Sequence, residues 1–376
     1  MSDHVISSYL KNKSAAKRIP LMSAFEISPV CNFKCKMCYV RKTADEAEKQ
    51  GGILPVDWWI DTAEQAREEG LLYPLITGGE PFLYPGIRRL LETLNRSGLF
   101  YTMNTNGALI TEEVIEWLSE IPPIRLNITL YGASDETYGR LCGDPKGFTK
   151  VRRAVELLKK AGISHRFNCS LTRQNMHDLK HIIEYGKSVE NPVKIATYMF
   201  PPIRRLEDTF GHNDRMTPEE CGYQKVLADY YQLSPESFER SAKYYCQFTP
   251  LEEIDFDSLP EGPGEYMHCL AGKCSYWVDW KGNLSACGMM NSPRISLKTT
   301  AFKDAWKEIV DYADHTVCRK ACSGCPNNKI CHTCITMVYS ETGTRNGRPE
   351  YYCRMMDAQA KAYRELLQKR DPEALA

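Results

Sequence analysis

The sequence predicts an α/β fold, because short β-like segments alternate with longer amphipathic segments from about residue 24 to residue 200. Six such pairs follow one another, and consecutive β–α pairs form parallel strands joined by right-handed crossovers. Eight pairs would close a full barrel, so six predict an open, partial (β/α)6 barrel that is TIM-like. The reacting groups are then expected at the carboxyl ends of the strands.

Strands and helices are expected to alternate through this region. The expected strands are AFEIS (24–28), YPLITGG (73–79), YTMNTNG (101–107), IRLNITLYG (124–132), HRFNCSLT (165–172) and VKIATYMF (193–200). The segments between them carry apolar residues at intervals of three and four, which indicates helices with one buried face. These helices are expected in DWWIDTAEQAREEG (57–70), PGIRRLLETLN (85–95), TEEVIEWLSE (111–120), KVRRAVELLKKAG (150–162) and MHDLKHIIEYGKS (176–188).

The remaining chain divides into four further parts. Residues 1–23 are expected to be an N-terminal extension, and the turn-rich stretch 201–265 a connector with a helix at about 217–231. Residues 266–365 carry many cysteines and little apolar periodicity, which is typical of a small domain that needs metal sites or other cross-links to fold. A last amphipathic helix is expected at about 354–368, followed by a tail that ends the chain (366–376).

Composition limits the classes of function. Lys plus Arg and Asp plus Glu both number 48, which argues against a nucleic acid or an acidic membrane surface as the main partner. The sequence contains no signal peptide and no apolar run of the roughly 20 residues that a membrane span needs. A cytoplasmic location is therefore expected, where thiols stay reduced. The 16 cysteines then indicate metal binding or catalysis rather than disulfides.

Three of these cysteines lie close together in CNFKCKMCY, directly after the first expected strand. Cys31, Cys35 and Cys38 are too few and too tightly spaced for a structural zinc site, which takes four ligands in two pairs. Three thiolates on one loop suit an iron–sulfur cube that leaves one iron open for a small molecule. A zinc site with a distant fourth ligand remains an alternative.

With Tyr39 after the third cysteine, this spacing resembles the cluster motif of the radical S-adenosylmethionine (radical SAM) superfamily. The family often has an aromatic residue before the third cysteine, where this chain has Met37. The resemblance implies that SAM chelates the open iron and that the reduced cluster passes one electron to its sulfonium. A 5′-deoxyadenosyl radical would then abstract hydrogen from the substrate, and flavodoxin or ferredoxin would serve as reductant.

The resemblance extends to residues expected to bind SAM. TGGEP follows the second expected strand, and it resembles the family motif for the methionine amino group, with Gly78 and Gly79 allowing close approach and Glu80 offering a carboxylate. By similarity, Thr129 and Arg140 would face the ribose and the carboxylate of SAM, although Arg140 could equally be a surface helix residue. Main-chain atoms near Tyr198 or Met199 would contact the adenine.

The C-terminal cysteines resemble the SPASM extension of radical SAM enzymes that mature peptides and proteins. This resemblance implies two auxiliary 4Fe–4S clusters, and therefore three clusters in all. The first would use Cys269, Cys274, Cys287 and Cys334, and the second Cys322, Cys325, Cys331 and Cys353. Cys334 departs from the usual spacing by one residue, and Cys318 is its main rival. One or two zinc knuckles would explain two C-x2-C pairs but not the other thiols.

The substrate is expected to be a peptide or protein side chain that is oxidised or crosslinked, as in maturases of ribosomally made peptides (RiPP-type). Only 30 residues precede Cys31, so a separate leader-recognition protein is a possible partner. The alternatives are an anaerobic sulfatase maturase, a dehydrogenase or decarboxylase of a sugar or tetrapyrrole, and a zinc or iron–sulfur protein without enzymatic activity. No catalytic base is identified, and Asp279 and Glu207 are candidates only by their expected position near the cavity.

Overall fold

The computed structural model describes residues 3–201, 214–267, 269–290 and 292–369. Its central feature is a parallel sheet, and the predicted partial (β/α)6 barrel is confirmed. The six strands are β1 (Met22–Glu26), β2 (Tyr73–Thr77), β3 (Thr102–Thr105), β4 (Arg125–Thr129), β5 (His165–Ser170) and β6 (Val193–Ala196). Each strand pairs in parallel with the next one in the sequence, as short crossover connections require.

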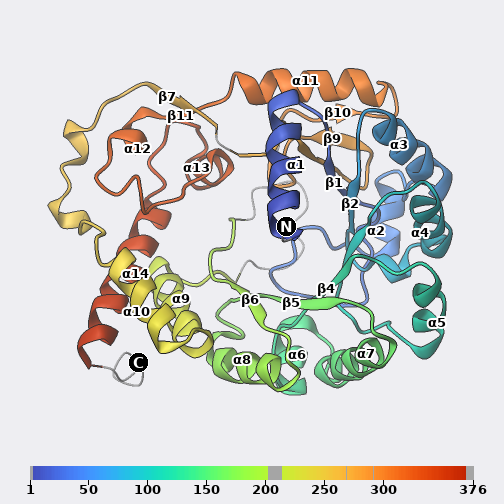
Figure 1. The fold of residues 1–376 in the computed structure, drawn as a ribbon, viewed down its shortest axis with the longest axis horizontal. Coiled ribbons are helices and arrows are strands. Elements are labelled where there is room, and N and C mark those ends of the chain that lie inside the picture. Colours follow the sequence, from blue (N-terminus) through green and yellow to red (C-terminus); the bar gives the residue numbers. More distant parts are fainter. Residues whose placement is uncertain (1–2, 202–213, 268, 291, 370–376) are drawn as a thin grey trace.

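Helices cover the outer side of this sheet in an arc (Figure 1). They are α2 (Ala44–Lys49), α3 (Val56–Glu68), α4 (Ile87–Arg96), α5 (Glu112–Glu120), α6 (Asp135–Cys142), α7 (Gly147–Ala161) and α8 (Leu179–Ser188), with the short turns η1 (Pro81–Leu83) and η2 (Met176–Asp178). Hydroxyl side chains start several of them. Thr111 and Ser134 accept hydrogen bonds from backbone N–H groups in the first turns of α5 and α6. Gly143 and Gly162, both with positive φ, end α6 and α7.

The two faces of the sheet have opposite characters because successive side chains of a strand alternate. The outward side chains are apolar and fully buried, namely Phe25, Ile76, Met103, Ile128 and Phe167. Two of them meet aromatic residues of the covering helices, since Phe25 contacts Trp59 of α3 and Phe167 contacts Tyr185 of α8. The other side of the strands, here called the inner face, is thereby left for polar side chains.

The sheet continues beyond the six predicted strands into the C-terminal part of the chain. Strand β8 (Ser275–Val278) pairs in parallel with β1, and β9 (Asn283–Ser285) and β10 (Ile295–Ser296) follow in antiparallel pairing. These strands were not expected from the sequence, because segments of two to four residues carry too little periodicity to be recognised. The cysteine-rich region and the barrel therefore share one sheet of nine strands.

The other C-terminal elements lie across the molecule from α4 and α5 (Figure 1). They are α9 (Pro218–Gln232), α10 (Pro235–Tyr245), η4 (Leu251–Glu253), η5 (Phe256–Ser258), β7 (Pro263–Tyr266), β11 (Val317–Arg319), α12 (Lys320–Gly324), α13 (Ile335–Thr342) and α14 (Glu350–Lys369). Helix α9 packs along α14, so both helices predicted outside the barrel are present and in contact. Helices α1 (Asp3–Lys17) and α11 (Phe302–Asp314) were not expected. In the described part of the chain, no helix has the length and apolar character to span a membrane.

A buried phenylalanine allows a test of this core. Phe25 is completely buried on β1 between the rings of Trp59 and Tyr276, so Phe25→Ala is expected to lower the free energy of unfolding by about 3–5 kcal/mol. Phe100→Ala is the matched control, because that side chain is 53% exposed and the loss should stay below about 1 kcal/mol. Urea unfolding followed by fluorescence measures both. Equal losses in the two variants would contradict the assignment of Phe25 to the core.

Candidate active site

The loop with the three predicted cluster cysteines lies at the carboxyl end of β1, where reacting groups of a parallel barrel are expected. Its backbone is held by the last residues of α6. The N–H of Lys34 donates to the carbonyl of Cys142 at 2.7 Å, and the N–H of Lys36 donates to the carbonyl of Leu141 at 3.1 Å. These carbonyls have no partner within their own helix, so the loop and the helix end satisfy each other.

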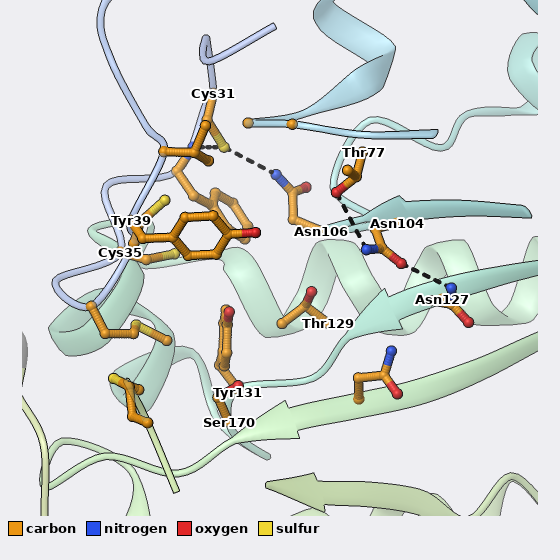
Figure 2. A pocket seen from close by; sticks show the side chains of 18 of the residues that line it. Cys31, Cys35, Tyr39, Thr77, Asn104, Asn106, Asn127, Thr129, Tyr131 and Ser170 are labelled. Atoms are coloured by element: carbon orange, nitrogen blue, oxygen red, sulfur yellow. Dashed lines mark hydrogen bonds between the residues drawn. The ribbon is translucent and has the colours of Figure 1, made fainter. Parts of the chain in front are cut away.

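The three thiols have surroundings suited to sulfur ligands. Backbone N–H groups of Phe33 and Arg41 donate to the sulfurs of Cys31 and Cys38 at 3.4 and 3.3 Å. The side-chain amide of Asn106 lies 3.7 Å from the sulfur of Cys31 (Figure 2). Burial raises the pKa of Cys31 to about 12, so the uncompensated thiolate is disfavoured. A bound metal supplies the missing positive charge and deprotonates such thiols.

A cavity of about 370 Å³ adjoins the thiols. Of the residues predicted to bind the cluster or SAM, those that line it are Cys31, Cys35, Cys38, Gly78, Gly79, Thr129, Tyr198 and Met199. Tyr39, which follows the third cysteine of the motif, also lines the cavity, and so do Asn106, Tyr131 and Ser170, for which no ligand role was predicted (Figure 2). Three thiols on one loop facing a cavity of this size fit a cluster with three protein ligands and room for a small molecule beside it.

The two glycines after β2 have a steric role that follows from their surroundings. A Cβ atom on Gly78 would lie 2.3 Å from the carbonyl oxygen of Ser28, and one on Gly79 would lie 2.3 Å from that of Val30. Gly78 also has a φ of 146°, which residues with side chains rarely adopt. The glycines therefore let the end of β2 lie directly against the backbone that leads into the cysteine loop.

Glu80 is completely buried and is not among the residues that line the cavity. Its carboxylate accepts hydrogen bonds from the hydroxyl of Thr105 and the N–H of Asn106, both at 2.8 Å, and from the N–H of Phe82 at 3.2 Å. In this arrangement Glu80 holds the turn that presents Asn106 to the sulfur of Cys31. Its predicted contact with the SAM ammonium group stays a prediction.

Arg140 also lies outside the cavity lining. Its guanidinium donates to the carbonyl of Gln174 at 3.0 and 3.2 Å and lies 2.6 Å from the ring nitrogen Nε2 of His177. Glu136, one turn earlier on α6, is 3.8 Å away. The arginine thus connects α6 to the loop after β5, and its predicted contact with the SAM carboxylate stays a prediction.

A hydrogen-bonded row of polar side chains crosses the inner face of the barrel beside the cavity. The amide of Asn104 donates to the hydroxyl of Thr77 at 3.3 Å, and the amide of Asn127 donates to the oxygen of Asn104 at 2.8 Å (Figure 2). All three line the cavity. The sequence signal was present in the alternation of apolar and polar residues in TMNT and RLNIT, which marks one polar face.

The cysteines predicted for the second auxiliary cluster come together. Cys322, Cys325, Cys331 and Cys353 line one small cavity of about 40 Å³, with Arg319 and Arg348 at its wall. Burial is the main cause that raises the pKa of Cys353 to about 11, and the charge of Cys322 adds to it. Three of them lie within residues 322–331, and the tertiary structure brings Cys353 of α14 beside them. Cys318 is not among the lining residues of this cavity.

The cysteines predicted for the first auxiliary cluster are also neighbours. Burial, followed by the charges of Cys287 and Cys269, raises the pKa of Cys334, while the N–H of Met337 donates to its sulfur at 3.3 Å. Cys269 likewise raises the pKa of Cys274, after burial. Cys334 therefore lies near Cys287 and Cys269, and its role as a cluster ligand stays a prediction.

A buried network joins the cavity to the cysteine-rich region. Tyr198, at the cavity wall, donates its hydroxyl to the carboxylate of Glu341 on α13 at 2.7 Å. Arg215 pairs with the same carboxylate at 2.6 Å, and both side chains are largely buried. The ring of Tyr198 also lies 5.7 Å from the ring of Tyr352, which precedes the cluster cysteine Cys353. This network positions the barrel end relative to the auxiliary thiols.

The two candidates for a catalytic base have different outcomes. Asp279 accepts hydrogen bonds from the N–H groups of Lys281 and Asn283 in the turn between β8 and β9, and it is not a cavity-lining residue. These hydrogen bonds hold the turn together, so Asp279 has a structural role there. Glu207 lies outside the described residues.

Comparison with known proteins identifies the family of the barrel region. Residues 25–186 match the Radical SAM superfamily, and they contain the cysteine loop, the glycine turn and strands β2 to β5. These residues therefore form a Radical SAM domain.

Similar proteins act on more than one kind of substrate. The chain is 23% identical over 342 residues to the AdoMet-dependent heme synthase of Methanosarcina barkeri, which covers 88% of this chain and 95% of that protein. It is 25% identical over 252 residues to the PqqA peptide cyclase of Bradyrhizobium diazoefficiens, which covers 60% of this chain and 63% of that protein. The solved structure of native anSMEcpe with bound AdoMet and Cp18Cys peptide has a TM-score of 0.64 at 18% identity, and it covers 95% of this chain and all of that one. This structural likeness shows the shared fold.

Glu80 gives a prediction for the pH dependence of stability. Burial raises the pKa of its carboxyl to about 7 in spite of its hydrogen bonds, while the unfolded chain has a value near 4.5. The folded state therefore binds the proton more tightly, and the free energy of unfolding should fall as pH rises from about 5 to about 7. Glu80→Gln removes this contribution, so the stability of the wild type relative to the variant should fall by on the order of 2 kcal/mol across that range.

Urea unfolding at pH 5, 6 and 7 measures this difference. Glu113→Gln on α5 is the control, because it removes a glutamate from an exposed position of the same barrel. A relative stability that rises with pH would contradict the raised pKa of Glu80.

Proposed function

We propose that Cys31, Cys35 and Cys38 bind a 4Fe–4S cluster and that SAM binds beside it in the adjoining cavity. The carrying observation is that three thiols of one loop face a cavity that Gly78, Gly79 and Thr129 also line. When bound, the reduced cluster and SAM supply the radical that abstracts hydrogen from the substrate. The protein itself binds and orients these groups and excludes water.

The residues of the chain divide these tasks. Asn106, positioned by Glu80, offers an amide to the sulfur of Cys31, and hydrogen bonds to cluster sulfurs tune the reduction potential. The ring of Tyr39 lies at the cavity wall in front of the loop (Figure 2), where it screens the site from solvent. The row from Thr77 to Asn127 provides fixed polar groups for the hydroxyl groups of a bound nucleoside.

We further propose a SPASM-type region with two auxiliary 4Fe–4S clusters. Its ligands are those predicted from the sequence, namely Cys269, Cys274, Cys287 and Cys334 for one cluster and Cys322, Cys325, Cys331 and Cys353 for the other. The common cavity of the second set supports this assignment, and so do the mutual charge effects in the first set. Four thiolates per cluster leave no open iron, so these clusters serve electron transfer.

The proposed substrate is a peptide or protein side chain, which the enzyme oxidises or crosslinks. Similarity to a peptide cyclase supports this class. A flavodoxin or ferredoxin would supply the electron, a separate protein would recognise a leader peptide, and the reaction would take place in the cytoplasm.

A second candidate is the oxidative decarboxylation of a tetrapyrrole. The observation that favours it is the match to an AdoMet-dependent heme synthase, which extends over 95% of that protein and 88% of this chain. The peptide cyclase matches a smaller part of the chain. Both candidates use the same hydrogen abstraction and differ in the group that the cavity must accept.

Iron content tests the three cluster sites. Anaerobically purified protein is expected to hold about 12 irons per chain. Replacing Cys31, Cys35 and Cys38 with Ala should leave about 8 irons and abolish the reductive cleavage of SAM, whereas replacing Cys322 and Cys325 with Ala should leave about 8 irons and retain that cleavage.

Cys246→Ala is the matched control, because this cysteine belongs to none of the three sets and should leave iron content unchanged. A loss of iron in Cys318→Ala together with full iron in Cys334→Ala would overturn the assignment of Cys334. A colourless zinc protein would refute all three cluster sites.

Product mass separates the two substrate classes. Peptide oxidation or crosslinking should give a product about two mass units lighter than the substrate, while tetrapyrrole decarboxylation should release carbon dioxide. Enzyme, SAM and reductant are incubated with a peptide encoded beside the gene or with an iron tetrapyrrole, and mass spectrometry detects the product. Conversion of the tetrapyrrole alone would reject the peptide proposal.

A further inference from the structure

The inner face of the barrel carries basic side chains on three adjacent strands. The pairing register sets Asn127 of β4 beside Arg166 of β5, and Asn168 of β5 beside Lys194 of β6. Arg125 lies two residues before Asn127 and therefore on the same face. Asn127 and Asn168 line the SAM cavity, and the three cations lie on the same face of the sheet, outside that lining.

These three cations have no acidic partner among the residues that the structure describes. The nitrogen Nε of Arg125 donates to the side-chain oxygen of Asn127 at 3.1 Å, while Nε of Arg166 is buried and finds no acceptor. Burial lowers the pKa of Arg125, and the nearby charge of Arg166 lowers it further. By contrast, Arg153 on the outer side of the barrel is paired with the carboxylate of Glu112. Buried polar groups are normally satisfied, so the buried Nε of Arg166 beside a second cation is a place where an anionic acceptor would be favoured.

The basic group is connected to the cavity. Arg125 begins the hydrogen-bonded row that continues through Asn127 and Asn104 to Thr77. The side-chain oxygen of Asn168, which also lines the cavity, is buried and accepts no hydrogen bond in the described structure. The oxygen of Asn168 is therefore an acceptor without a donor beside the cavity. A ligand that reaches from the cavity along the inner face would offer a donor to this oxygen and an anionic group to the basic residues.

We propose that Arg125, Arg166 and Lys194 form a subsite that binds a carboxylate group of the substrate on the inner face of the barrel. This inference rests on the proposed function, because it assumes a substrate that enters the SAM cavity. A planar guanidinium binds a carboxylate through two parallel hydrogen bonds and balances its charge, and a neighbouring cation adds to the attraction. The subsite therefore predicts a substrate that carries an acidic group remote from the reacting carbon. An acidic peptide residue and the propionate of a tetrapyrrole share this chemistry.

Paired probes test the subsite and separate the two sources. The porphyrin arm compares coproporphyrin III with its tetramethyl ester, and the peptide arm compares an N-acetylated, C-amidated hexapeptide that contains one glutamate with its glutamine analogue. Binding to the anaerobic holoprotein with SAM, but without reductant, is measured by calorimetry so that no turnover occurs. Arg166→Met and Arg125→Met are each expected to weaken binding of the acidic probe about tenfold and to leave the neutral probe unchanged. If the effect appears in the porphyrin arm, the carboxylate belongs to a tetrapyrrole, and if it appears in the peptide arm, the carboxylate belongs to a peptide.

The control is Arg152→Met, which removes an exposed arginine from α7 on the outer side of the barrel and should change neither affinity. The thermal midpoint without ligand is a second measurement. A binding role predicts that Arg166→Met keeps or raises this midpoint, because it removes one of two repelling charges, and a fall of several degrees would indicate a structural role and overturn the proposal. Equal affinity for acidic and neutral probes in the wild type would also overturn it. Iron content and SAM cleavage of the wild type report separately on the proposed function.

Discussion

The attachment of the cysteine loop to the ends of β1, β2 and α6 is the constraint on which the site depends. Three thiols can share one cluster only if their loop has a single conformation. The loop is held on one side by the carbonyls of Leu141 and Cys142, and on the other by the backbone of the glycine turn. Two contacts of 2.3 Å that a Cβ would make explain why this turn consists of Gly78 and Gly79. These backbone contacts, together with the buried side chains of Phe33 and Met37, determine where the sulfurs lie.

The division of the sheet into an apolar outer face and a polar inner face gives the barrel its capacity for chemistry. The outer residues bury large apolar surfaces against the helices, and this burial stabilises the fold. Polar side chains on the inner face contribute less to stability than apolar ones would, and the burial of the outer residues offsets this loss. Asn104, Asn127 and Arg125 are such side chains, and they form a connected row, of which Asn104 and Asn127 line the cavity.

The contacts between the barrel and the cysteine-rich region connect the proposed SAM site to the proposed auxiliary clusters. Strand β8 extends the barrel sheet, so the region with the auxiliary thiols is attached at β1. Glu341 of α13 connects to the opposite end of the sheet through Tyr198, which follows β6. With both ends of the open sheet attached, the auxiliary thiols have a defined position relative to the cavity. Such rigidity suits electron transfer, which requires stable distances between centres.

Local sequence patterns were enough to predict the barrel and the loop that carries the three cysteines. Amphipathic periodicity and β–α alternation are local signals, and the spacing of Cys31, Cys35 and Cys38 lies within one loop. Only the tertiary structure decided the roles of residues whose partners are distant in sequence. Glu80 turns into the protein toward Asn106, strand β8 joins β1, and Arg166 meets Arg125 without an acid. Periodicity specifies which face a side chain occupies, whereas its partner depends on which strands and loops the folded chain brings beside it.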